Sequence, residues 1–116
     1  MNASLITADI SKLQDILGAI DALSGCSLRD FMDRQKLHAA AFEFVIIGEA
    51  TRQISQAFKN EHSHLPWREM QDTRNKIAHE YGTLSPKRMI EIIQDELPEL
   101  RRQIVVLLNH LESGIK

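Results

Sequence analysis

Apolar side chains recur along the chain at alternating spacings of three and four residues, which is the repeat of an amphipathic helix. The first stretch with this repeat has a stripe of Ile6, Ile10, Leu13, Leu17 and Ile20. Gly25 breaks the pattern, so we expect the first helix to end before it. The last stretch has a stripe of Ile93, Leu97, Leu100, Ile104, Leu107 and Leu111. Pro98 lies within this stripe and predicts a kink or a division into two helices.

The second stretch, over residues 33–58, is apolar on two opposite sides. One side carries Leu37, Ala41, Phe44, Ile47 and Gly48, and the other carries Phe42, Val45 and Ile46. A helix that is apolar on both sides must be covered on both sides. In so short a chain, we expect one cover to be a second copy, which predicts a homodimer. Gly48 in mid-helix also predicts a close contact with another helix.

A polar segment, residues 60–65, separates the second stretch from the third and is interpreted as a loop. It holds His62 and His64, which would make half of a metal site, but no nearby cysteine or carboxylate pair completes one. Pro66 suits the first turn of a third helix, which we expect to run to Gly82. Ser85 and Pro86 then predict an N-cap and the first residue of a new helix.

The pattern as a whole predicts an all-α fold, an up-and-down bundle of about four to five helices in one domain over residues 1–116. The 43% hydrophobic and 26% charged fractions are typical of a soluble globular protein. The single cysteine, Cys26, excludes an internal disulfide and favours a reducing compartment. No apolar run approaches membrane-spanning length and the start does not resemble a signal peptide, so we expect a cytoplasmic protein without membrane contact.

The overall charge does not favour a nucleic-acid-binding protein, because the net value is −2. The charge is unevenly distributed, however. Residues 1–50 carry four Lys or Arg against seven Asp or Glu, whereas residues 66–88 carry five against three. The third stretch is therefore the candidate for contact with an anionic substrate.

Helical geometry places Arg74 in the apolar stripe of the third helix with Trp67, Met70, Ile77, Ala78 and Tyr81. A buried arginine needs a carboxylate partner, such as Glu49, or must open onto a cleft or a partner surface. His79 lies about 140° around the helix from Arg74, and Asn75 shares its face and could orient the imidazole. Convergence of Arg74 and His79 then needs the long reach of arginine, fraying of the helix end before Gly82, or contributions from two subunits. This geometry favours a cleft at a dimer interface.

The chemistry of these residue types suits cleavage of RNA without a metal or other cofactor. Histidine exchanges a proton near neutral pH, as activation of a ribose 2′-hydroxyl or protonation of a leaving oxygen requires. Arginine binds phosphate with a planar fork and stays charged while negative charge builds at phosphorus.

The motif Arg74-Asn75-x-x-x-His79-x-Tyr81 resembles the signature of the HEPN superfamily, in the branch of HepT-like toxins. Two flanking segments, residues 47–50 (Ile-Gly-Glu-Ala) and 65–67 (Leu-Pro-Trp), also resemble that branch. The chain differs from it in Asp72-Thr73, where small or apolar residues are expected. The resemblance covers roughly residues 31–100.

This resemblance implies a metal-independent endoribonuclease toxin, a homodimer in which Arg74 and His79 meet in a cleft between subunits, with Asn75 and Glu49 in support. It also implies a partner, an MntA-type nucleotidyltransferase antitoxin, which transfers AMP from ATP onto Tyr81 and so blocks the site. The alternative function is a non-catalytic subunit that binds the substrate for a small nucleotidyltransferase. The alternative roles of single residues are an ion pair for Arg74, a surface position for His79 and a core aromatic for Tyr81.

Overall fold

The computed structural model describes residues 3–79 and 82–115. Its elements are α1 (Ala3–Leu23), the 3-10 turn η1 (Asp30–Met32), α2 (Arg34–Gln53), α3 (Gln56–Glu61), α4 (Trp67–Gln71), α5 (Thr73–Lys76), α6 (Pro86–Glu91), the π-helical segment η3 (Ile92–Glu96) and α7 (Leu97–Ile115). Over these residues, extended pairing is limited to one isolated antiparallel bridge between Ala78 and Leu84. The prediction of an all-α fold is confirmed.

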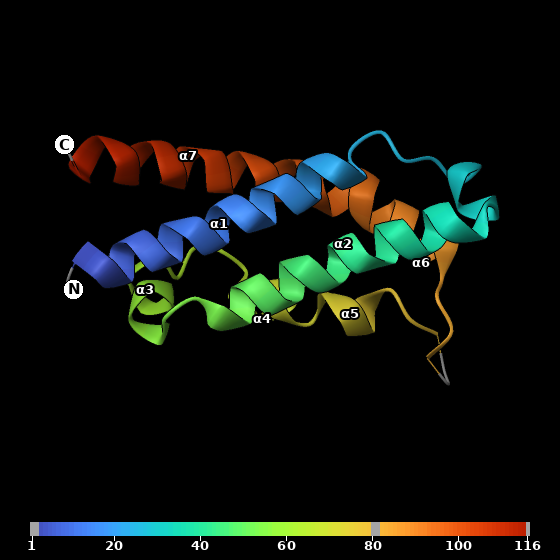
Figure 1. The fold of residues 1–116 in the computed structure, drawn as a ribbon, viewed down its shortest axis with the longest axis horizontal. Coiled ribbons are helices and arrows are strands. Elements are labelled where there is room, and N and C mark those ends of the chain that lie inside the picture. The colour runs from blue at the N-terminus through green and yellow to red at the C-terminus, as the bar shows by residue number, and fades with distance from the viewer. Residues whose placement is uncertain (1–2, 80–81, 116) are drawn as a thin grey trace.

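The long helices lie side by side, and α2 and α7 run opposite to α1 (Figure 1). Helix α1 packs between α2 and α7, and α4 and α5 pack along α2. The resulting body measures 46 × 26 × 22 Å. Its core is formed by the apolar stripes of these helices, and its fully buried side chains include those of Leu13, Ile16, Leu23, Phe44, Ile47 and Ile104.

The first helix ends where the sequence predicts. Gly25 follows α1 with a φ of +88°, a left-handed conformation that glycine adopts without steric cost. The next helix begins after Asp33, whose carboxylate accepts hydrogen bonds from the N–H groups of Gln35 and Lys36. This N-cap satisfies donors that the first turn of α2 leaves free.

The helix predicted over residues 33–58 is wrong only in its continuity, because the chain breaks after Gln53, the last residue of α2. Ile54 is extended, with ψ at 138°, and α3 starts again with Ser55 as its N-cap. The buried Asp9 of α1 causes this break: its carboxylate accepts hydrogen bonds from both the N–H and the hydroxyl of Ser55, each at 2.8 Å. These bonds tie the start of α3 to α1.

Gly48 lets α4 approach α2 closely, as its mid-helix position predicts. A Cβ built on Gly48 would lie 3.0 Å from the carbonyl oxygen of Gln71, the last residue of α4. A Cβ contact at this distance is tighter than nine in ten of those found in proteins. The absence of a side chain at Gly48 therefore places α4 directly against α2.

Pro98 disturbs the last stretch in the predicted region. Residues 92–96 form the π-helical turn η3, and α7 continues from Leu97. A proline lacks the N–H that would bond to the carbonyl four residues earlier, and a π-helical turn is one way for a helix to accommodate that loss. The turn also buries Ile92 and Ile93 in the core.

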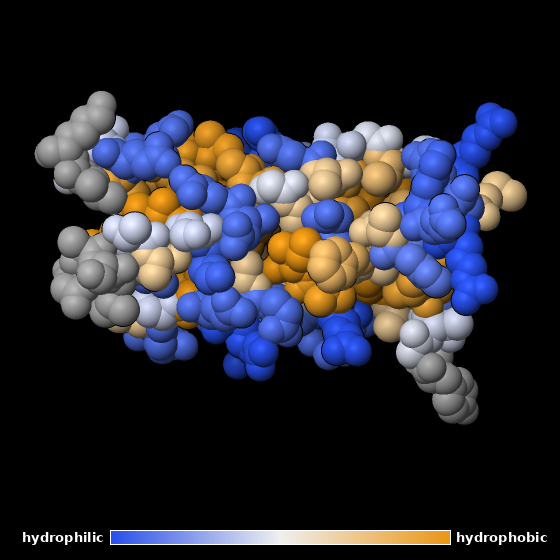
Figure 2. Space-filling view, viewed as in Figure 1, coloured by the Kyte–Doolittle hydropathy of each residue, from blue (hydrophilic) through white to orange (hydrophobic). Residues whose placement is uncertain are grey.

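The two phenylalanines of α2 point in opposite directions. Phe44 is fully buried, whereas the side chain of Phe42 is 62% exposed. Val45 and Ile46, on the same side as Phe42, are half-buried. Figure 2 shows an apolar patch over α2 near the middle of the molecule. In the described part of the chain, no helix is long and apolar enough to cross a membrane.

Candidate active site

The segment that carries the motif is not one continuous helix, and the predicted helix from Pro66 to Gly82 is wrong. Helix α4 ends at Gln71, Asp72 joins it to the short α5, and helical structure stops at Ile77. The hydroxyl of Thr73 donates to the carbonyl of Met70 at 2.5 Å. Threonine hydroxyls that bond to nearby carbonyls compete with regular helix geometry, which agrees with the break at this point.

His79 lies in a loop rather than on a helix. Its N–H donates to the carbonyl of Thr83 at 2.6 Å, beside the bridge between Ala78 and Leu84. Gly82 has a φ of +78° and donates its N–H to the carbonyl of His79, so it shapes this turn instead of ending a helix. The helical angle predicted between Arg74 and His79 therefore does not apply. The imidazole is exposed to solvent.

The described residues around His79 line a cavity of about 320 Å³, formed by Lys76, Ala78, His79, Ser85, Lys87, Arg88 and Glu91. Ser85 begins α6 as its N-cap and Pro86 is its first residue, as predicted. This start places Lys87 and Arg88 beside the loop of His79. The sequence interpretation missed both residues, although the predicted N-cap was a signal for their position.

Carboxylates neutralise part of the positive charge at this cavity. The ammonium of Lys76 lies 2.7 Å from a carboxylate oxygen of Glu96. The guanidinium of Arg88 lies 3.2 Å from Glu91 and 3.8 Å from Glu96. Lys87 forms no ion pair with any other residue that the structure describes. Lys87 is therefore the cation beside His79 best able to meet a phosphate.

Arg74 is exposed on α5, so the prediction that it is embedded among core positions is wrong. The break at Asp72 changes the register, so Thr73 is buried in place of Arg74, while Ile77 is buried as predicted. Within the described ranges, Arg74 has no carboxylate partner. Glu49 is also exposed and pairs with Arg52 at 2.7 Å, so the alternative of an Arg74–Glu49 ion pair is wrong.

The amide of Asn75, predicted from the sequence to orient the imidazole of His79, directs its amino group elsewhere. The side-chain amide of Asn75 donates to a carboxylate oxygen of Asp72 at 2.6 Å, so its amino group is directed toward α4 rather than toward the loop of His79. Arg74 and His79 are both exposed, and Arg74 is not among the described residues that line the cavity of His79. Tyr81 lies outside the described residues.

The two histidines of the loop before α4 show no complete set of metal ligands. Their rings are 6.2 Å apart, and the ring of His62 packs on that of Phe58 at 4.5 Å. Burial of His62 lowers its pKa, an effect that the nearby Glu61 opposes. Among the described residues, no group of three His, Cys, Asp or Glu side chains is placed to hold a metal ion.

A family model described as "Ribonuclease HepT-like" matches residues 8–107. The chain belongs to the HepT-like ribonuclease family. The matched region contains Arg74, Asn75, His79 and Tyr81.

Relatives within this family align over most of the chain. "Putative RNase TTE0752" of Caldanaerobacter subterraneus subsp. tengcongensis is 34% identical over 97 residues, which cover 83% of this chain and 87% of the relative. "Probable ribonuclease HepT" of Thermococcus cleftensis is 31% identical over 94 residues, 77% of this chain and 86% of the relative. "Putative RNase MJ1380" of Methanocaldococcus jannaschii is 25% identical over 100 residues, 82% of this chain and 92% of the relative. No solved structure matches the chain.

Proposed function

We propose that this HepT-like protein is a metal-independent endoribonuclease that acts as the toxin of a toxin–antitoxin pair. The observation that carries the proposal is the position of His79, exposed in a cavity with Lys76, Lys87 and Arg88. A proton-exchanging group beside several cations suits a reaction at a phosphodiester. The names of the relatives support the same class of reaction.

The proposed reaction needs no group beyond those of the protein and the RNA. The ribose 2′-oxygen loses its proton and forms a bond to phosphorus, while the bond from phosphorus to the leaving oxygen breaks and that oxygen gains a proton. His79 exchanges one of these protons. Arg74 binds the phosphate oxygens and stabilises the charge that builds on them.

The proposed active form is a homodimer, which would bring Arg74 of one subunit toward His79 of the other. Two observations support it: Arg74 does not line the cavity of His79, and α2 exposes Phe42 beside the half-buried Val45 and Ile46. A second copy packed on this face would remove these apolar side chains from water.

Phe42→Ser tests the dimer by light scattering after size exclusion. The expected result is a dimer for the unmodified chain and a folded monomer for the variant. Leu28→Ser is the matched control, because Leu28 is 54% exposed in the turn between α1 and α2, outside the apolar side of α2. A well-folded monomer from the unmodified chain at micromolar concentration contradicts the proposal.

Cleavage of single-stranded RNA by purified protein tests the ribonuclease activity. His79→Ala should abolish cleavage, and His110→Ala, which removes an exposed histidine from α7, should not. A chelator should leave the activity unchanged. Undiminished cleavage by His79→Ala, or complete inhibition by the chelator, contradicts the proposed mechanism. A dimer that binds a nucleotidyltransferase but cleaves no RNA would favour the non-catalytic alternative.

Regulation is proposed to occur at Tyr81, through AMP transfer from ATP by an MntA-type nucleotidyltransferase antitoxin. The bond forms between the tyrosine oxygen and the α-phosphorus of ATP, and pyrophosphate leaves. The added charge and bulk would block access of RNA to the adjacent site. Intact mass after incubation with the partner and ATP tests this: the unmodified chain should gain adenylyl mass and Tyr81→Phe should not. Equal gain by both excludes Tyr81 as the acceptor.

A further inference from the structure

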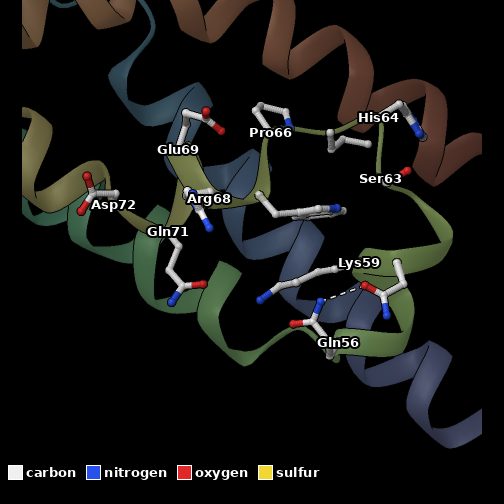
Figure 3. A pocket seen from close by; sticks show the side chains of 12 residues that line it. Gln56, Lys59, Ser63, His64, Pro66, Arg68, Glu69, Gln71 and Asp72 are labelled. Atoms are coloured by element: carbon white, nitrogen blue, oxygen red, sulfur yellow. Dashed lines mark hydrogen bonds between the residues drawn. The ribbon is translucent and has the colours of Figure 1, made fainter.

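A second cavity lies away from His79, between α3 and α4, and has a volume of about 1040 Å³. Its walls include Gln56, Lys59 and Asn60 from α3, and Trp67, Arg68 and Gln71 from α4 (Figure 3). It shares no lining residue with the cavity of His79. The proposed catalytic chemistry therefore leaves this cavity without a role.

Trp67 forms one wall of the cavity and is held in a fixed orientation. Its indole N–H donates to the carbonyl of His62 at 2.9 Å, and its ring packs edge-on against Phe58 with centroids 6.2 Å apart. The side chain is half-buried, so part of the ring remains accessible from the cavity. A preorganised aromatic surface of this kind is suited to stacking against a nucleobase.

Two cations, Lys59 and Arg68, also line the cavity. Figure 3 shows the ammonium of Lys59 extending toward the side where Arg68 and Gln71 lie. Neither Lys59 nor Arg68 forms an ion pair with another described residue, in contrast to Lys76 and Arg88. Burial lowers the pKa of Lys59, and the carboxylate of Asp9 opposes this shift. A bound anion would stabilise the charged form of Lys59 in the same way.

Three side-chain amides complete the walls with hydrogen-bonding groups. The amide nitrogen of Gln56 donates to the amide oxygen of Asn60 at 2.9 Å. This bond holds both side chains while leaving the oxygen of Gln56 and the nitrogen of Asn60 for a ligand. Gln71 adds a further amide on the side of α4. Amides of this type supply both donors and acceptors to the edge of a base.

We propose that this cavity is a nucleotide subsite that binds one nucleotide of the RNA substrate, with the base against Trp67 and the phosphate on Lys59 and Arg68. The proposal rests on the proposed ribonuclease function and adds a substrate-binding site to it. The carboxylates of Glu69 and Asp72 also line the cavity. In Figure 3 both lie on the far side of Arg68 as seen from Lys59. They are suited to accept hydrogen bonds from an amino group of a base.

A nucleotide within an RNA strand fits this position better than a free nucleotide does. Asp72 lines the cavity and also accepts the hydrogen bond of Asn75, which adjoins Arg74. Arg74 follows Asp72 by two residues, in α5, so the chain keeps the two residues within about 7 Å of each other. A single strand seated in the cavity would therefore continue toward Arg74 within a few nucleotides.

Trp67 provides a direct measurement, since it is the single tryptophan of the chain. His79→Ala protein, which should not cleave, is titrated with a short single-stranded oligoribonucleotide while tryptophan emission is recorded. The expected result is saturable quenching. Adding Lys59→Ala or Arg68→Ala should weaken binding about tenfold and lower the slope of log affinity against log salt by about 0.7, the loss of one phosphate contact.

Arg34→Ala in the same protein is the matched control, because Arg34 is an exposed cation at the start of α2 and does not line the cavity. It should leave the quenching unchanged. Binding of a labelled oligonucleotide without a change in Trp67 emission, or equal effects of Arg68→Ala and Arg34→Ala, overturns the subsite even where the unmodified chain cleaves RNA. Quenching by AMP with the same affinity as the oligonucleotide overturns the assignment of the cavity to an RNA strand. Quenching that only a nucleotidyltransferase produces does the same. Quenching by the oligonucleotide with no cleavage by the unmodified chain leaves the subsite supported and refutes the ribonuclease proposal.

Discussion

The long helices α1, α2 and α7 keep a regular repeat of buried apolar side chains. The segment from Pro66 to Ser85, in contrast, has only short helices and irregular turns. In the long helices, burial is continuous from turn to turn. In the irregular segment, two short helices and a bridged loop leave Arg74, Asn75 and His79 exposed. The first region carries most of the hydrophobic stabilisation, and the second carries the candidate chemistry.

This division predicts that substitutions in the two regions change different quantities. A change in the long helices should alter the free energy of unfolding, and a change at the exposed motif should alter activity at constant stability. The contact between Gly48 and Gln71 joins the regions, because α4 packs directly on α2 there. Substitutions at that contact should affect both quantities.

The largest expected effect is on stability, from Phe44→Ala. Phe44 is fully buried in α2, and truncation of a buried phenylalanine costs about 3–5 kcal/mol of unfolding free energy. Leu28→Ala, at a side chain that is 54% exposed, should stay within about 0.5 kcal/mol of the unmodified chain. Urea unfolding of both variants measures the difference. Similar losses of unfolding free energy at the two positions would contradict the placement of Phe44 in the core.

Arg74→Ala should have the opposite kind of effect: a large loss of activity at an unchanged melting temperature. A group that stabilises charge in the transition state contributes at least about 100-fold in rate. Arg74 is exposed and has no ion pair among the described residues, so its removal costs little stability. Arg29→Ala, another exposed arginine, is the control in the same cleavage assay. A fall in melting temperature in proportion to the lost activity would instead indicate a structural role.

The same division explains which parts of the fold the sequence predicts. The repeat of apolar positions predicts α1 and α7. Gly25, Gly48 and Pro98 predict the end of α1, the close helix contact and the disturbed last helix. The break after α2 depends on Asp9 and Ser55, which are 46 residues apart and meet only in the folded chain. The periodic spacing of apolar residues therefore cannot predict this contact or the break that accompanies it.

The candidate site is harder to predict because its geometry depends on local departures from regular structure. The motif predicts which residues to consider, but the break at Asp72 moves Arg74 from the core to the surface. The turn at Gly82 then takes His79 off the helix. Lys87 reaches the neighbourhood of His79 only because this turn folds the start of α6 back toward α5. The Trp67 cavity likewise depends on the packing of α3 beside α4.

Gly48→Ala tests the contact that joins the two regions. The new methyl group would lie 3.0 Å from the backbone oxygen of Gln71, so α4 must shift, at a cost of about 1–3 kcal/mol. Gly18→Ala is the matched control in α1, where nothing lies within 4 Å, and it should stabilise the protein by about 0.5–1 kcal/mol. Thermal unfolding and RNA cleavage are measured for both. A stable Gly48→Ala protein with unchanged cleavage would show that the contact does not position the motif.

The smallest expected effect is at the charges around His79, through Glu96→Gln. Glu96 pairs with Lys76 at 2.7 Å and lies 3.8 Å from Arg88, so it neutralises cations that face the cavity. Partly exposed ion pairs of this kind contribute little to stability, and removing one should change the melting temperature only slightly. Freed of Glu96, Lys76 can turn toward a bound phosphate, and we expect RNA binding at low salt to strengthen about two- to fivefold. Glu99→Gln removes the same charge from α7, where Glu99 pairs with Arg102 at 2.6 Å, and serves as the control. Because both variants change the net charge equally, a gain shared by both would reflect overall charge, and a gain confined to Glu96→Gln would locate the phosphate at the cavity of His79.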